Sequence, residues 1–219
     1  MMSIILLVLF FSIIHVKTTG VKIENPLFVT SRTVLLAASH SNMNRNNYQY
    51  FFYYGPTNNK HANQTIKQYT STTNLTALVT DLRPDTIYYY RAIVYSLGTN
   101  PTVRLSQWST FTTLKKPILQ AQTPIKMSNE SVLLSGTITN YGSKYLYYKF
   151  GYKDAFAPTY IYTDAIHVPF DGINSVNYKL DNLASQTYYD YHIVAWEQHD
   201  NNNYFSNVCR FELGLTINC

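Results

Sequence analysis

The chain has 219 residues, a formal net charge of +5 and only 13% charged residues. Its 17 Lys and Arg are scattered, with Lys115-Lys116 the only adjacent pair, so the sequence lacks the basic stripe of a nucleic-acid-binding surface. The length predicts one or two domains, and the 21 tyrosines and 11 phenylalanines favour strands.

Residues 1–20 have the pattern of a secretory signal. Ile4 to Ile14 is almost wholly apolar, and Thr18-Thr19-Gly20 supplies small residues at a cleavage site. The apolar run is shorter than the ~20 residues that a membrane-spanning helix needs, which favours cleavage over an uncleaved anchor. No second long apolar run follows, so we expect a secreted, extracellular protein without a membrane span.

Beyond the signal, the pattern predicts strands and turns throughout. Short alternating runs bounded by Asn, Gly, Ser, Thr and Pro recur about every 8–12 residues, as in all-β domains. The three sequons begin at Asn63, Asn74 and Asn129, which we expect to be glycosylated after secretion.

An internal repeat divides the chain. The stretch 82–94 returns at 183–195, an offset of 101 residues. Three more pairs agree with it, at offsets of 98, 96 and 100: 33–37 with 131–135, 50–55 with 146–151, and 105–111 with 205–211. The repeat predicts two similar domains at 21–113 and 117–213, joined by a linker at 114–116 and followed by a tail at 214–219.

The order of motifs in the first repeat resembles the fibronectin type III family. It runs Tyr-x-Phe-x-Tyr-Gly at 50–55, Leu-x-Pro-x-Thr-x-Tyr-x-Tyr-Arg at 82–91 and Thr-Phe-Thr-Thr at 110–113, and the second repeat carries a weaker copy. The resemblance implies an all-β chain of two tandem seven-stranded immunoglobulin-like sandwiches. It also implies that Tyr88 and Tyr189 are tyrosine-corner residues, whose hydroxyl groups bond to nearby backbone. Such a fold does not fix a function.

Alternation along the strands predicts an aromatic outer face on the first domain. Tyr88 and Tyr90 point inward, so their neighbours point outward. Strands C, F and G share a sheet in this fold, so the outer face should gather Phe51, Tyr53, Ile87, Tyr89, Arg91, Ile93, Tyr95 and Trp108. Exposed apolar patches mark interaction sites, which predicts a protein partner here. The alternative is that the C′ segment, the linker or the second repeat covers this face.

The equivalent face of the second repeat is more polar and predicts ordinary solvated surface. Its residues are Tyr145, Tyr147, Lys149, Tyr188, Asp190 and His192.

The stretch 105–109, Leu-Ser-Gln-Trp-Ser, resembles the Trp-Ser-x-Trp-Ser box of cytokine receptors, with Leu in place of the first Trp. That resemblance implies a cation–π stack of Arg91 on Trp108. The box lies in the first domain rather than the second, and the receptors' four-cysteine pattern is absent, so a chance match is favoured. A soluble cytokine-receptor-like decoy and a carbohydrate-binding or adhesive module remain the alternatives to a protein-binding module.

No catalytic pattern appears, and we expect neither an enzyme nor a cofactor. The chain has no Gly-x-Ser-x-Gly and no His-Glu-x-x-His. His40, His61 and His199 lie in Asn-rich stretches, which predicts solvated loops. Cys209 and Cys219 can bridge within the chain, or Cys219 can pair between chains, while two thiols fall short of a metal site.

Overall fold

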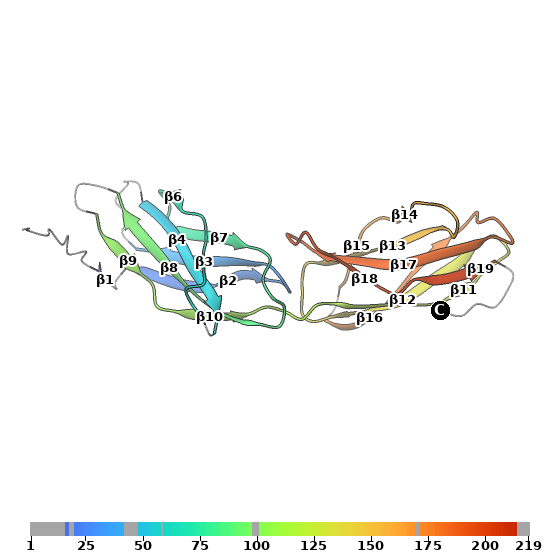
Figure 1. Ribbon diagram of the computed structural model, residues 1–219, viewed down its shortest axis with the longest axis horizontal. Helices are drawn as coiled ribbons and strands as arrows, with labels where there is room; N and C mark the ends of the chain where they lie inside the picture. The colour runs from blue at the N-terminus through green and yellow to red at the C-terminus, as the bar shows by residue number, and fades with distance from the viewer. Residues whose placement is uncertain are drawn as a thin grey trace, which may run out of the picture. The chain divides into compact units, whose positions relative to one another are not determined.

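The computed structural model describes residues 16–17, 20–41, 48–57, 59–97, 101–169 and 171–213. Within these ranges every regular element is a β-strand, and the chain forms two compact units (Figure 1). The predicted all-β class is confirmed. Residues 1–15 of the predicted signal and residues 214–219 of the predicted tail lie outside the described residues.

The first sandwich, blue to green in Figure 1, pairs a three-stranded sheet with a larger one. The smaller sheet has the order β2-β3-β7, with strands Val21–Val29, Val34–His40 and Asn74–Val79. The larger sheet has the order β1-β9-β8-β4-β5, with β10 paired to β8 and β6 paired to β4. Its strands are Val16–Lys17 (β1), Tyr48–Pro56 (β4), Asn63–Gln64 (β5), Gln68–Thr70 (β6), Ile87–Ser96 (β8), Val103–Leu105 (β9) and Ser109–Thr112 (β10).

The second sandwich repeats this arrangement. Its smaller sheet has the order β11-β12-β16, with strands Ile118–Lys126, Val132–Asn140 and Gly172–Leu180. The larger sheet has the order β14-β13-β17-β18, with β15 paired to β13 and β19 paired to β17. Its strands are Leu146–Asp154 (β13), Ile161–Tyr162 (β14), Ile166–His167 (β15), Tyr188–Glu197 (β17), Asn203–Phe205 (β18) and Cys209–Glu212 (β19).

Each sandwich has seven strands in the fibronectin type III order when the divided edge strands are counted once. Strands A, B and E form the smaller sheet, and C′, C, F and G form the larger one. In the first sandwich β5 with β6 is C′, and β9 with β10 is G. Strand β1 is additional to these seven strands. Its residues, Val16 and Lys17, belong to the segment predicted as a signal and pair in parallel with Val103 and Arg104 of β9.

Buried tyrosines tie the two sheets of each sandwich together. Tyr90 is fully buried on β8, and its hydroxyl donates to the carbonyl oxygen of Glu24 on β2 at 2.6 Å. Tyr191 does the same on β17, donating to the carbonyl oxygens of Gln122 and, at 2.9 Å, of Ser135. Burial raises the pKa of Tyr90 and raises that of Tyr191 to about 12, so both hydroxyls stay protonated donors.

The turns before β8 and β17 have the same backbone shape. Asp81 and Asp85 in the first turn, and Asn182 and Gln186 in the second, all have φ between 49° and 60°. Asp and Asn tolerate this left-handed region better than most residues. In the second turn the backbone N–H of Ala184 donates to the Tyr189 hydroxyl at 3.0 Å.

Two histidines placed in or beside solvated surface by the sequence are buried instead. His40 ends β3 at 1% exposure, and its Nε2 lies 3.1 Å from Nη1 of Arg104 on β9. His192 lies on β17 at 6% exposure. The prediction of a solvated loop for His40 is therefore wrong, because β3 extends to this residue and its ring packs against Tyr48 and Arg104.

Candidate binding face

The outer face of the larger sheet in the first sandwich carries a continuous cluster of rings and cations. Antiparallel pairing of β4 with β8 places Tyr53 opposite Arg91 and Phe51 opposite Ile93. We call the following residues the cation–aromatic face: Tyr53, Lys60, His61, Lys67, Tyr89, Arg91, Tyr95 and Trp108.

Aromatic contacts run along this face from one end to the other. The Arg91 guanidinium carbon lies 4.6 Å from the Trp108 ring centroid, which is the stack that the cytokine-receptor resemblance implies. His61 lies between the rings of Trp108, at 5.0 Å, and Tyr53, at 5.2 Å. Tyr53 meets Phe51 edge-on at 5.1 Å, and Phe51 stacks on Tyr95 at 5.8 Å. These separations are those of favourable aromatic pairs.

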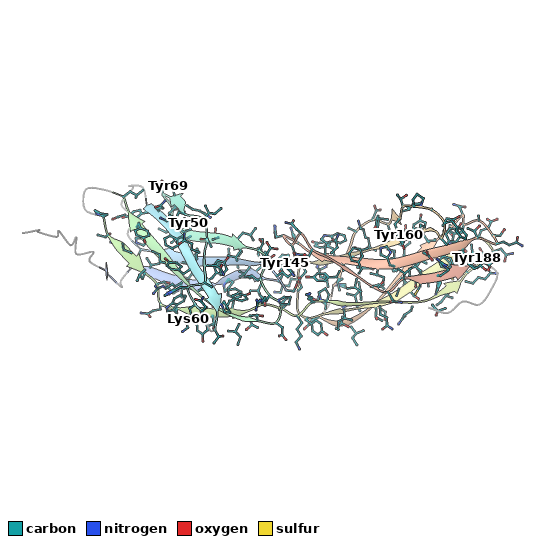
Figure 2. The ribbon with its side chains drawn as sticks, in the orientation of Figure 1. Tyr50, Lys60, Tyr69, Tyr145, Tyr160 and Tyr188 are labelled. Carbon is teal, nitrogen blue, oxygen red and sulfur yellow. The ribbon has the colours of Figure 1, made fainter. Side chains whose placement is uncertain are left out.

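Two lysines add to the row. Lys60 Nζ lies 4.1 Å from the Tyr89 ring centroid, and Lys67 Nζ lies 5.9 Å from that of Phe51. Both distances are within the range of cation–π attraction. Figure 2 shows Lys60 and Tyr69, the latter on β6, on opposite sides of Tyr50.

A break in the last strand places Trp108 on this face. The N–H of Ser106 donates to the Ala92 carbonyl at 3.0 Å, and the Ala92 N–H donates back to the Ser106 hydroxyl at 2.9 Å. This exchange separates β9 from β10 and lets the chain bulge between them. Ser206 makes the same pair of bonds with Ile193 in the second sandwich.

A tight turn after β4 brings Lys60 and His61 over the sheet. A Cβ on Gly55 would lie 1.9 Å from the Asn59 carbonyl oxygen, so only glycine allows this approach. The returning segment is fixed by Thr65, whose N–H donates to the Phe52 carbonyl at 2.9 Å and whose hydroxyl accepts from the Phe52 N–H at 3.0 Å. Thr163 bonds to Phe150 in the same way in the second sandwich.

The structure corrects part of the predicted contact set. Phe51 and Ile93 lie on the predicted face, but each is only 2% exposed, so neither can touch a partner directly. Phe51 is packed by Tyr53 and Tyr95 of the same sheet and by Lys67 of the C′ segment, which was one of the alternatives predicted from the sequence for covering this face. Of the other predicted residues, Ile87 is exposed, and Tyr53, Tyr89, Arg91, Tyr95 and Trp108 are half-buried.

Sequence reasoning missed Lys60 and His61, which lie between β4 and β5, and Lys67, which lies between β5 and β6. The alternation of a strand says nothing about a loop that folds back over it. The glycine at the end of Tyr-x-Phe-x-Tyr-Gly, present in both repeats as Gly55 and Gly151, was the available signal.

The outer face of the second sandwich is not ordinary solvated surface. Asp190 and His192 are each 6% exposed, and Asp190 accepts two bonds from Arg210, at 2.7 and 3.1 Å. Rings cover His192, with centroids at 4.3 Å for Tyr160 and 5.9 Å for Phe205. That prediction is wrong because the ring of Tyr160, which precedes β14, packs against His192 of β17, and Arg210 of β19 pairs with Asp190.

Among the described residues, no group of three or more His, Cys, Asp or Glu is placed to hold a metal ion. No helix in the described ranges is long and apolar enough to cross a membrane. Cys209 is disulfide-bonded, and Cys219 lies outside the described residues. Asn63, Asn74 and Asn129 are all exposed.

The two sandwiches define the class of immunoglobulin-like tandem modules with fibronectin type III strand order. Solved structures with this arrangement are similar to the chain at low identity. A chicken CNTN1 structure with domains FN1–FN3 is 18% identical with a TM-score of 0.34, over 88% of this chain and 64% of that one. A two-domain fibronectin type III segment of chicken tenascin is 15% identical with a TM-score of 0.34, over 88% and 97%.

A marsupial T cell receptor is 13% identical with a TM-score of 0.45, over 88% of this chain and 73% of the receptor chain. No model of a protein family matches the sequence, and no curated protein matches it. The fold assignment therefore rests on the strand order and register of the chain itself.

Proposed function

We propose that the chain is a secreted, non-enzymatic binding protein that engages a protein partner through the cation–aromatic face. The domains proposed are 21–113 and 117–213, with residues 1–20 removed as a signal and with glycans on Asn63, Asn74 and Asn129. The observation that carries the proposal is the row of rings and cations on the outer side of β4 and β8, where a half-exposed antiparallel sheet ordinarily presents polar residues.

The composition of the face supports binding to a protein. Trp, Tyr and Arg are the residues that most often dominate the energy of protein interfaces. Here Arg91 stacks on Trp108 and Lys60 stacks on Tyr89, so little side-chain entropy is lost when a partner binds. The buried side chains of Phe51 and Ile93 act as a rigid support beneath them.

The experiment uses the purified full chain as bait against an array of extracellular proteins. Every hit is tested again with Tyr53→Lys plus Tyr89→Lys, and with the matched pair Tyr147→Lys plus Tyr188→Lys on the second sandwich. We expect the first pair to abolish binding and the second pair to leave it within about twofold, because side chains far from an interface act independently. The proposal is wrong if every protein that binds the wild type also binds the Tyr53→Lys plus Tyr89→Lys variant equally well and that variant has unchanged stability.

Secretion is tested by expressing the full sequence in a eukaryotic secretory host and measuring the intact mass of protein in the medium. We expect a new N-terminus at Val21 and a mass that falls after glycan removal. Protein that stays cell-bound with Met1 in place would contradict this part of the proposal.

A further inference from the structure

Charge is divided unequally between the two repeats. Residues 21–113 contain eight Lys or Arg against three Asp or Glu, a formal charge of +5. Residues 117–213 contain six against nine, a formal charge of −3. The modest net charge of the whole chain therefore conceals a strongly basic first sandwich.

The carboxylates of the first sandwich lie away from the cation–aromatic face. Glu24 lies on β2 in the opposite sheet, where it pairs with Lys22 at 3.1 Å and accepts from the Ser39 hydroxyl. Asp81 and Asp85 lie in the turn before β8. Sequence and strand order thus leave Lys60, Lys67 and Arg91 as the charged residues of the face.

These three cations have no carboxylate partner among the described residues of the chain. Each has an aromatic ring beside it instead. Arg91 Nη2 lies 3.3 Å from His61 Nε2, and Arg91 Nε is buried without a hydrogen-bond partner in the part of the chain that the structure describes. The Arg91 guanidinium lies over the Trp108 ring, and a guanidinium is the group best suited to bind a carboxylate with two hydrogen bonds.

Exposed apolar side chains lie close in sequence to the cations. Ile66 is 85% exposed between β5 and β6, Tyr69 on β6 is 73% exposed, and Ile87 at the start of β8 is 51% exposed. Such groups gain nothing from a highly sulfated polysaccharide, whereas protein interfaces combine apolar contact with aromatic and Arg residues. The mixture favours an acidic protein over a polyanionic sugar.

We infer that the partner meets this face with an acidic protein surface, whose carboxylates contact Arg91, Lys60 and Lys67. This inference rests on the proposed function and names the chemistry of its partner. Unpaired cations of one sign attract an oppositely charged surface, speed the encounter and make the association sensitive to salt.

The test uses two probes, an acidic polypeptide (a random Glu/Tyr copolymer) and heparin. The full secreted chain is compared with Lys60→Ala plus Lys67→Ala plus Arg91→Ala, and with a matched triple in the second repeat, Lys126→Ala plus Lys144→Ala plus Lys179→Ala. We expect the copolymer to bind, the face triple to weaken binding by about tenfold or more, and the control triple to leave it within about twofold. Raising NaCl from 50 to 300 mM should weaken the wild type more than the face triple.

Equal losses from both triples, or no binding of the copolymer, would overturn the inference. Binding of heparin without binding of the copolymer would assign the face to a sulfated polysaccharide and overturn it as well. The proposed function would survive either result if capture of a protein partner still depended on Tyr53 and Tyr89. Failure of this inference can therefore be told apart from failure of the proposed function.

Discussion

At the scale of the residue, alternation assigned each side chain of the first Tyr-rich strand to its correct side. Tyr88 and Tyr90 are buried in the sandwich, and Tyr89 and Arg91 lie on the outer side. A strand with one buried face specifies this assignment strongly, because a one-residue slip would move every side chain to the wrong face. Alternation does not predict how exposed an outward-facing side chain is, since Ile93 points outward and is still buried.

The cross-sheet hydroxyls give a prediction for single residues. Tyr90→Phe and Tyr191→Phe each remove a hydrogen bond and leave a backbone carbonyl of the opposite sheet short of a donor. We expect each to lower the free energy of unfolding of its own sandwich by about 1 kcal/mol. Chemical denaturation measures this, with Tyr69→Phe, whose ring is exposed, as the control that should change nothing. A loss no larger than that of the control would contradict the bridging role.

His192 gives a prediction about pH. Burial lowers the pKa of His192 below its ordinary value of 6.5, so the folded second sandwich holds the neutral ring. The unfolded chain takes up a proton first as the pH falls, so stability is full above about pH 6.5 and declines below it. The rings that contact His192 are those of Tyr160, Tyr162 and Phe205, and Asp190, two residues earlier on β17, pairs with Arg210.

The measurement is denaturation at pH 7 and pH 5, followed by Trp196 fluorescence in a Trp108→Phe background. We expect His192→Phe to lose less stability than the parent on acidification, because the titrating group is gone. If His192→Phe and the parent lose the same free energy of unfolding between pH 7 and pH 5, His192 contributes nothing to acid sensitivity.

At the scale of the element, the two repeats share side-chain-to-backbone hydrogen bonds that are hard to predict from their sequences. Ser106 and Ser206 divide the last strand, and Thr65 and Thr163 fix the returning C′ segment. Each occupies a corresponding place in the two repeats, yet Ser and Thr are common in both strands and turns of this chain. The strands could be predicted because their period is regular, whereas these side-chain-to-backbone bonds have no period to detect.

Gly55 supplies the prediction for this turn. In Gly55→Ala the new Cβ would lie 1.9 Å from the Asn59 carbonyl oxygen, so this carbonyl must move, and Lys60 and His61 must move with it. We expect a loss of about 1–3 kcal/mol of unfolding free energy in the first sandwich, the usual size of an overpacking defect. Thr57→Ala, exposed in the same turn, is the matched control. Full stability in Gly55→Ala would mean that the turn relaxes freely and that its closeness to β4 is not required.

At the scale of the whole molecule, the internal repeat predicted two sandwiches, and the strand order agrees with it. The sequence did not allow a similar prediction of which residues of the binding face are exposed and which are covered. A covered sheet and an open one can share the same alternation, and the cover here comes from Lys60, His61 and Lys67 outside the repeated motifs. The unequal charge of the two repeats was readable from composition once the repeat boundaries were drawn.

The outer side of β4 and β8 in the first sandwich is the surface that we propose meets a partner. Amide hydrogen exchange of the full chain, free and bound to a protein recovered with the wild-type bait, tests it most directly. We expect new protection in β4, in residues 59–70 and in β8, with the second sandwich unchanged. Protection confined to the second sandwich, or to the β2-β3-β7 sheet, would contradict it.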